Sequence, residues 1–432
     1  MKKIKMVGVD ETLINETLSN GLKVYLLPNK NVKNFYMTFS TKFGSNDTEF
    51  KKTNAKKTMS VPNGTAHFLE HLTFKMKGNI DATDYFVKLG SDVNAYTTFN
   101  VTCYEVFGYD LFKENLETLL DFVQTPFYTE KLVEEEKGII KEEVKMYDDD
   151  IETELIFRLF KNSFHKDNTK NLVSGTVEDV QSISLNDLEK AYKTFYHPSN
   201  MYVTITGNFN AEEALAIIEG NQEKKKFPRK ESVIKIKEKE PNTVVKEFEE
   251  IKRDVEIDKV NIGLKIPYSA FSSLKLTRLQ ENVYINILTN SMFGRTSKIK
   301  EKLVSGNIIT DGLYVSRTYL ENHVFVNIIA ETPYPKRYIT LMEEAIKEFE
   351  IEEDELIRKK RVAISNLIKC FDDIEETNNL IQSDILEYGD INANLYNIYN
   401  DLNIKTAKKI ASKINTKNKS ILVVKKKKTE KK

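Results

Sequence analysis

A densely charged segment divides this 432-residue chain close to its midpoint. Residues 221–250 read NQEKKKFPRKESVIKIKEKEPNTVVKEFEE, and their many charges and two prolines are typical of a linker. On both sides of it, strand and helix patterns follow in a partly repeated order: strand, loop, two helices, two strands and further helices. The repeat predicts an α+β fold with two homologous domains, each a mainly antiparallel sheet covered by helices. We therefore expect an N-terminal domain at residues 1–222, a charged linker at 223–250 and a C-terminal domain at 251–432.

Composition excludes several classes of protein. The 65 basic and 65 acidic residues give a formal net charge of zero, whereas a nucleic-acid-binding protein needs a basic excess or stripe. The two cysteines, Cys103 and Cys370, lie far apart and suit neither a disulfide framework nor a zinc–cysteine cluster. We find no secretory signal at the N-terminus and no apolar run near the ~20 residues of a membrane span. These features predict a soluble, cytoplasmic protein without a membrane partner.

The most specific motif is HFLEH, from His67 to His71, in a segment with the pattern of a helix over residues 65–76. Residues three and four apart share one helix face, so His67, Glu70 and His71 point the same way. Two such imidazoles can bind one zinc ion, and Glu70 then lies beside a metal-bound water whose proton it can accept. HxxEH is the inverted form of the HExxH zinc-protease motif. The alternative is an amphipathic helix that carries two of the chain's five histidines by accident.

A catalytic zinc held by two histidines usually takes one carboxylate as third ligand and keeps a fourth position open. The helix predicted over residues 129–148 offers candidates by its phase. At about 100° per residue, Glu136 and Glu143 fall inside its apolar arc, together with Ile139 and Tyr147, and Glu142 falls on the opposite side. A carboxylate on a buried stripe is expected to be paired or metal-bound. We predict Glu143 as the third zinc ligand and Glu136 as a partner that orients a histidine; tolerated boundary glutamates are the alternative.

Together, these residues resemble the inverted-motif zinc metallopeptidases, the family of pitrilysin, insulin-degrading enzyme and the mitochondrial processing peptidase. The match includes HFLEH and the acidic helix EKGIIKEEVKMYDD, which begins at Glu136. The resemblance implies that His67, His71 and Glu143 bind one Zn²⁺ per chain. It also implies that Glu70 is the general base and Glu136 an auxiliary carboxylate. The length is similar to that of the half-size bacterial branch, which has two homologous α+β domains per chain.

Two further segments look like parts of the family. Asn94, Ala95, Tyr96 and Thr97 resemble its edge strand, which implies that they bind the substrate peptide by β-augmentation. The segment YHPSNM, residues 196–201, is similar to the segment that closes the first domain, so we interpret His197 as structural. His165 and His323 are interpreted in the same way.

The second half departs from the family pattern. There the family usually has an arginine and a tyrosine, in a pattern like LRExxGLAY, that bind the substrate backbone. The matching positions here are Val304 and Thr310, and neither side chain can replace them. We therefore expect a second, related chain to supply the Arg/Tyr pair in a heterodimer; a homodimer that uses another basic residue is an alternative.

The sequence thus predicts a zinc-dependent endopeptidase that processes or degrades unfolded peptides, as the catalytic subunit of a heterodimer. The alternative from a different class is a non-catalytic subunit that binds peptides or scaffolds such a complex. Inactive members of the family typically lose the zinc motif, which this chain keeps.

Overall fold

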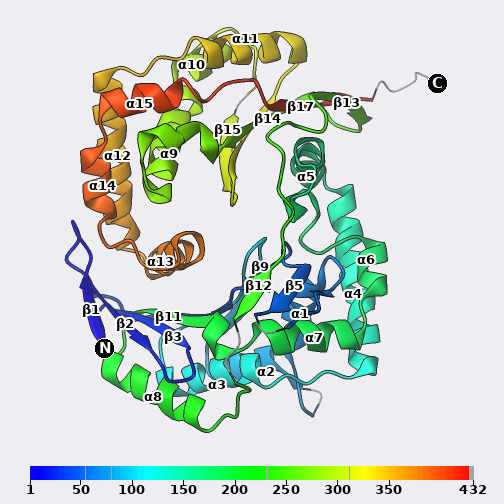
Figure 1. The fold of residues 1–432 in the computed structure, drawn as a ribbon, viewed down its shortest axis with the longest axis vertical. Coiled ribbons are helices and arrows are strands. Elements are labelled where there is room, and N and C mark those ends of the chain that lie inside the picture. The colour runs from blue at the N-terminus through cyan, green and yellow to red at the C-terminus, as the bar shows by residue number, and fades with distance from the viewer. Residues whose placement is uncertain (54, 79, 230–231, 311, 428–432) are drawn as a thin grey trace. The chain divides into compact units, whose positions relative to one another are not determined.

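The computed structural model describes residues 1–53, 55–78, 80–229, 232–310 and 312–427, and they form two compact units (Figure 1). Unit 1 contains Met1–Tyr147, Asn171–Lys237 and Ile368–Asn394, and unit 2 contains Asp148–Lys170, Glu238–Leu367 and Leu395–Lys432. Each unit therefore includes chain from both halves of the sequence. The division into residues 1–222, 223–250 and 251–432 stays a prediction about homologous segments.

Unit 1 is built on a seven-stranded sheet with the order β1-β2-β3-β11-β4-β10-β9. Its strands are β1 (Lys2–Lys5), β2 (Thr12–Thr17), β3 (Lys23–Pro28), β4 (Phe35–Thr41), β9 (Asp92–Thr97), β10 (Thr102–Gly108) and β11 (Met201–Gly207). All neighbours pair antiparallel except β3 and β11, which are parallel. Among the described strands β9 pairs with β10 alone, so it lies at the edge of the sheet.

One face of this sheet carries the hydrophobic core of unit 1. Because successive side chains of a strand point to opposite faces, Phe35, Met37 and Phe39 of β4 enter the core, whereas Thr38 and Ser40 point away from it. Helices of unit 1 add their apolar sides: α1 (Thr65–Thr73), α2 (Ala82–Lys88), α3 (Phe112–Gln124), α4 (Glu130–Asp149), α6 (Val177–Ser182), α7 (Leu185–Phe195) and α8 (Ala211–Glu223). A small three-stranded sheet has the order β12-β5-β6, with β5 (Glu49–Lys52), β6 (Met59–Ser60) and β12 (Val233–Lys235). The short strands β7 (Lys75–Met76) and β8 (Ile80–Asp81) form a two-stranded sheet.

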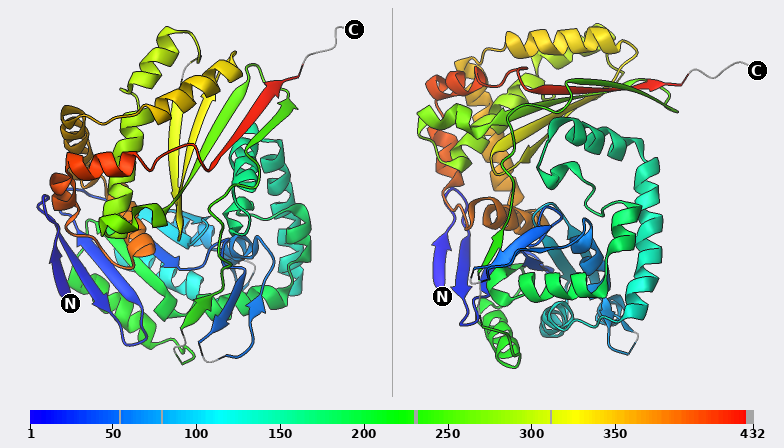
Figure 2. Two further views of the ribbon diagram at one scale, coloured as in Figure 1. Left: turned by 45° about the horizontal axis from the view of Figure 1, so that its top comes forward. Right: turned by 45° about the vertical axis from the view of Figure 1, so that its right-hand side comes forward.

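Unit 2 repeats the topology of unit 1. Its five-stranded sheet has the order β13-β17-β14-β16-β15, with β13 (Phe248–Arg253), β14 (Lys259–Pro267), β15 (Leu313–Tyr319), β16 (His323–Glu331) and β17 (Lys419–Lys426). Only the β13–β17 pair is parallel among these described strands, as only β3–β11 is parallel in unit 1. The left view of Figure 2 shows the red strand β17 between the green strands β13 and β14. The shared order confirms the predicted duplicated α+β fold.

The remaining helices complete the chain. They are α5 (Ile151–Ser163), α9 (Arg278–Phe293), α10 (Lys298–Ser305), α11 (Pro335–Lys347), α12 (Glu353–Cys370), α13 (Ile374–Tyr388), α14 (Leu395–Asp401) and α15 (Ile404–Ala411), with the 3-10 turns η1 (Asn168–Lys170), η2 (Pro198–Asn200) and η3 (Tyr268–Leu274). Within the described ranges, no helix is both long enough and apolar enough to cross a membrane.

Each sheet is covered by a helix from the other half of the sequence. In unit 2, α5 packs on β14 and β17, and Asn261 Nδ2 donates a hydrogen bond to Leu155 O at 3.0 Å. In unit 1, α13 packs on β4 and β11, and Thr38 Oγ1 donates to Asn378 Oδ1 at 2.9 Å. The two helices are thus exchanged between the halves of the chain.

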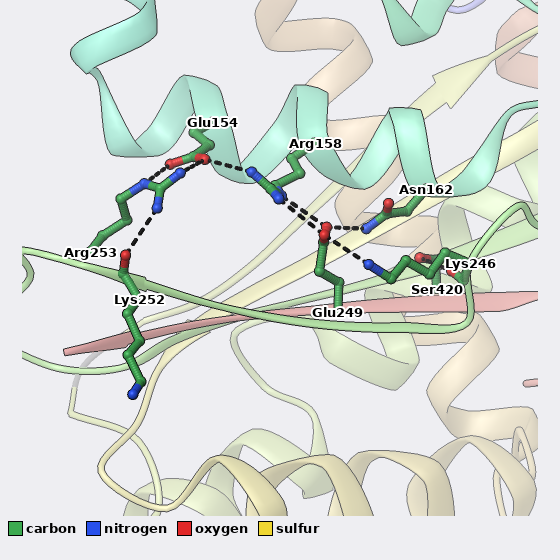
Figure 3. A network of polar contacts seen from close by, with 8 residues as sticks. All are labelled: Glu154, Arg158, Asn162, Lys246, Glu249, Lys252, Arg253 and Ser420. Carbon is green, nitrogen blue, oxygen red and sulfur yellow. Dashed lines mark hydrogen bonds and ion pairs between the residues drawn. The ribbon is translucent and has the colours of Figure 1, made fainter. Parts of the chain in front are cut away.

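A polar network holds α5 on the sheet of unit 2 (Figure 3). Glu249 of β13 accepts hydrogen bonds from Arg158 Nε at 2.8 Å and from Asn162 Nδ2 at 2.8 Å. Glu154, one turn before Arg158, pairs with Arg253 of β13. The hydrogen bonds from Arg158 outweigh burial and lower the pKa of Glu249 to about 2. These charge-assisted contacts fix the helix against the edge strand.

Candidate metal centre

Helix α1 presents His67 and His71 on one face. It begins after Gly64, whose φ of 80° lies in the left-handed region, and a Cβ there would lie 2.2 Å from Ser174 O. The close approach therefore requires glycine at the start of the helix. One turn apart, the two imidazole rings have centroids 4.6 Å from each other. His67 and His71 thus lie one helical turn apart on α1, as their spacing in the sequence predicts.

The third candidate ligand, the carboxylate of Glu143, comes from α4. Glu143 Oε1 lies 3.5 Å from His67 Nε2, and Glu143 Oε2 lies 3.4 Å from His71 Nε2. Two ligand atoms about 2.0–2.1 Å from a zinc ion, at a tetrahedral angle, are about 3.3–3.4 Å apart. The two measured distances end on different oxygens of Glu143, and one ligand atom from each of the three residues lies within 4.8 Å of the others, so the donor set fits one zinc ion. Across the described residues, one group of at least three His, Cys, Asp or Glu side chains is close enough together to hold a metal ion. It consists of His67, His71 and Glu143.

Glu136 lies behind His71, two turns before Glu143 on the same helix. Its side chain is buried, and its Oε1 lies 2.9 Å from His71 Nδ1. The contact occupies one ring nitrogen and leaves Nε2 to face Glu143, as in carboxylate–histidine–zinc triads. Burial lowers the pKa of His71, but the hydrogen bonds with Glu136 and Glu143 outweigh it and raise that pKa to about 9. Hydrogen bonds from His67 and His71 hold the pKa of Glu143 well below its usual range.

Glu70 shares the face of α1 with the two histidines and is 8% exposed. Its Oε2 accepts a hydrogen bond of 2.5 Å from Thr97 Oγ1, at the end of β9. A buried carboxylate beside two candidate metal ligands is placed to exchange a proton with a molecule bound there.

The four residues of the predicted substrate strand lie along the edge strand β9. Asn94, Ala95, Tyr96 and Thr97 pair on one side with Glu105, Tyr104, Cys103 and Thr102 of β10. Their side chains alternate, and Thr97 faces Glu70 while the Asn94 amide donates to Glu105 on the other face. The last residue of β9, Thr97, therefore contacts Glu70 beside the candidate metal centre.

Tyr147 also contacts the candidate metal centre, although the sequence pattern places it only in the apolar arc of its helix. Its hydroxyl donates to Glu143 Oε1 at 2.8 Å, and burial together with this bond raises the pKa of Tyr147 to about 12. The spacing of four residues from Glu143 was the available signal. The predicted arc was also too wide, since Ile139 is 55% exposed while Glu136, Ile140 and Val144 are buried.

The second half has no arginine or tyrosine at the expected positions. Val304 on α10 is 47% exposed, and Thr310 is exposed as well. The nearby Arg317 on β15 donates to Thr289 Oγ1 and Asn290 Oδ1 of α9, so its guanidinium binds within unit 2.

Comparison with known proteins agrees with this architecture. The model of the insulinase family, peptidase family M16, matches residues 59–177, and that of the peptidase M16 inactive domain matches residues 182–362. The uncharacterized zinc protease YmfH of Bacillus subtilis is 35% identical over 368 residues, which cover 84% of this chain and 85% of that relative. This chain belongs to peptidase family M16.

Two solved structures are similar over nearly their whole length. A putative M16-like peptidase from Alicyclobacillus acidocaldarius is 25% identical with a TM-score of 0.91, covering 98% of this chain and all of the other. A protease from Helicobacter pylori is 20% identical with a TM-score of 0.82, covering 96% of this chain and 99% of the other. The chain is therefore a half-size member of the family.

Proposed function

We propose that this M16 chain is a zinc-dependent endopeptidase that cleaves unfolded peptides. The observation that carries the proposal is the convergence of His67, His71 and Glu143 at separations that suit one zinc ion per chain. When bound, zinc lowers the pKa of a water molecule to about 7 and polarises a carbonyl group. The names of the relatives as zinc proteases support the choice of metal.

The residues of the chain have separate roles in this proposal. Glu70 accepts a proton from the attacking water and passes it to the leaving amine. Glu136 fixes the orientation of His71 through Nδ1. The free side of β9, at Asn94, Ala95, Tyr96 and Thr97, pairs with the extended peptide through main-chain hydrogen bonds.

A partner chain is part of the proposal, because Val304 carries no hydrogen-bond donor and the Thr310 side chain is too short and too weakly acidic to replace tyrosine. We propose a cytoplasmic heterodimer in which a related chain supplies the Arg/Tyr pair. Purified chain alone is then a poor peptidase, and adding the partner raises its rate. An unchanged rate, with a homodimer in analytical ultracentrifugation, would favour a lone homodimeric enzyme.

The competing function is a non-catalytic, peptide-binding or scaffold subunit. The match of residues 182–362 to the inactive-domain model favours a non-catalytic role for the second half of the chain. The candidate metal ligands, however, lie in the first half. Zinc content separates the two functions: about one zinc per chain supports the peptidase, and none after metal-replete purification supports the scaffold.

The decisive experiment combines zinc analysis with cleavage of a quenched fluorescent peptide library. E70Q is expected to keep zinc and lose cleavage, because the amide cannot accept the proton of water. E142Q is the matched control, since Glu142 is exposed on α4 next to Glu143 and pairs with Lys145. Cleavage by E70Q at the rate of the unmodified chain would contradict the assignment of the general base.

A further inference from the structure

The Glu70 carboxylate is held by a side chain of the edge strand. Thr97 is the last residue of β9, and its hydroxyl donates to Glu70 Oε2 at 2.5 Å. Within the described part of the chain, the Glu70 carboxylate accepts one hydrogen bond, and Thr97 is its donor. Because Glu70 is 8% exposed, water has limited access to replace Thr97 as donor. A hydroxyl bonded to a carboxylate is a charge-assisted and therefore strong contact.

The surrounding hydroxyls fix the direction of this bond. Thr102 lies directly opposite Thr97 on β10, and its single hydroxyl proton goes to Phe43 O at 2.9 Å. The Thr102 oxygen lies 3.4 Å from Thr97 Oγ1, which is much farther than the 2.5 Å to Glu70. The one hydroxyl proton of Thr97 is therefore committed to Glu70.

We infer that Thr97 is a positioning residue that orients Glu70 for proton transfer. The inference rests on the proposed peptidase function. With Oε2 bound to Thr97, Oε1 is the oxygen left to accept the proton as the water O–H bond breaks and the water oxygen bonds to the scissile carbon. The same proton then leaves Oε1 for the amine nitrogen as the C–N bond breaks, so the carboxylate is regenerated.

This role differs from the one that the sequence predicts for Thr97. Pairing with a substrate strand uses the backbone of β9, whereas the side chain of Thr97 points to α1. The edge strand would thus both bind the peptide and orient the general base. Substitutions of the side chain separate these roles, because loss of substrate binding changes KM and loss of Glu70 orientation changes kcat.

The first test compares T97V, which keeps the shape but removes the donor, with T97S, which keeps the donor. The zinc-loaded chain is assayed with its partner on a fluorescent peptide. We expect T97V to lower kcat by about 10–100-fold, as misorientation of a catalytic group typically does. KM and zinc content should stay unchanged, and T97S should restore most of kcat. T17V is the control, since Thr17 is an exposed residue at the end of β2 in the same sheet.

Either of two kinetic results would overturn the inference: a rise in KM at constant kcat, or the same loss in T97S as in T97V. A double-mutant cycle of melting temperatures tests the contact without any activity. T97V should lower the melting temperature of the unmodified chain and have no effect in an E70A background. Equal effects in both backgrounds would refute the contact. An unmodified chain that binds zinc but cleaves nothing with any partner would instead refute the proposed function.

Discussion

Removing the carboxylate behind His71 is the sharpest test of the candidate metal centre. Glu136 Oε1 lies 2.9 Å from His71 Nδ1, and the Glu136 side chain is 5% exposed. E136Q keeps an oxygen that can accept the Nδ1 proton but removes the negative charge. E136A removes both, so that Nδ1 of His71 loses the partner that orients the imidazole. The two substitutions therefore separate charge from orientation.

The expected magnitude follows from this geometry. Loss of a partner behind a metal-bound histidine costs about 10–100-fold in metal affinity, which corresponds to about 1.4–2.7 kcal/mol. Because the contact is short and shielded from solvent, we expect E136A near the upper limit and E136Q near the lower limit. Zinc affinity should therefore decrease from the unmodified chain to E136Q and further to E136A.

The assay is competition for zinc with a chromophoric chelator at constant pH. E135Q is the matched control, because Glu135 is 56% exposed on the same helix and pairs with Lys131 at 3.6 Å. Its affinity should equal that of the unmodified chain. The reasoning would be refuted if E136A bound zinc as tightly as E135Q, since the contact with His71 would then have no bearing on the metal.

Further predictions concern the same centre and the stability of unit 2. Y147F should weaken zinc binding in the same assay by less than E136A does, because the lost hydroxyl bond to Glu143 is partly exposed; equal loss would contradict this ranking. The folded-state pKa of Glu249 is about 2 against a usual 4.5, so its stabilisation is complete above pH 4.5 and is lost as pH falls toward 2. Urea unfolding of E249Q at a series of pH values should show a flatter decline over that window. E240Q should destabilise by about 3–5 kcal/mol, because it leaves the Lys265 ammonium buried without its carboxylate; urea denaturation showing under 1 kcal/mol would contradict this. Chelation should abolish cleavage, and added zinc should restore it.

The centre itself could be predicted from the sequence because its geometry is mostly local. Helical spacing places His67 and His71 on one face of α1, and helical phase places Glu136 on the buried side of α4. The duplicated fold was also predictable, since strands and helices alternate in the same order in both halves.

Long-range contacts could not be predicted. The bond between Thr97 and Glu70 joins a strand to a helix, and no periodic pattern indicates which side chains meet there. Local rules also failed where tertiary packing overrides them. Asp110 is a good N-cap residue, but α3 begins later, after Leu111, which has a φ of 52° in the left-handed region. The exposure of Ile139 likewise depends on what packs against α4 and not on its phase.

The exchanged helices have a consequence for synthesis on the ribosome. The strands β4 and β11 are complete once Gly207 has been made, but α13, which covers them, begins only at Ile374. At about 5–20 residues per second, that interval lasts on the order of ten seconds or more. Until α13 is made, the face of the sheet that it will cover exposes the hydroxyls of Thr38, Ser40 and Thr206, which water can solvate. These hydroxyls lie beside the rings of Tyr36 and Tyr202, so the face stays partly polar while the last helices of the chain are still unmade.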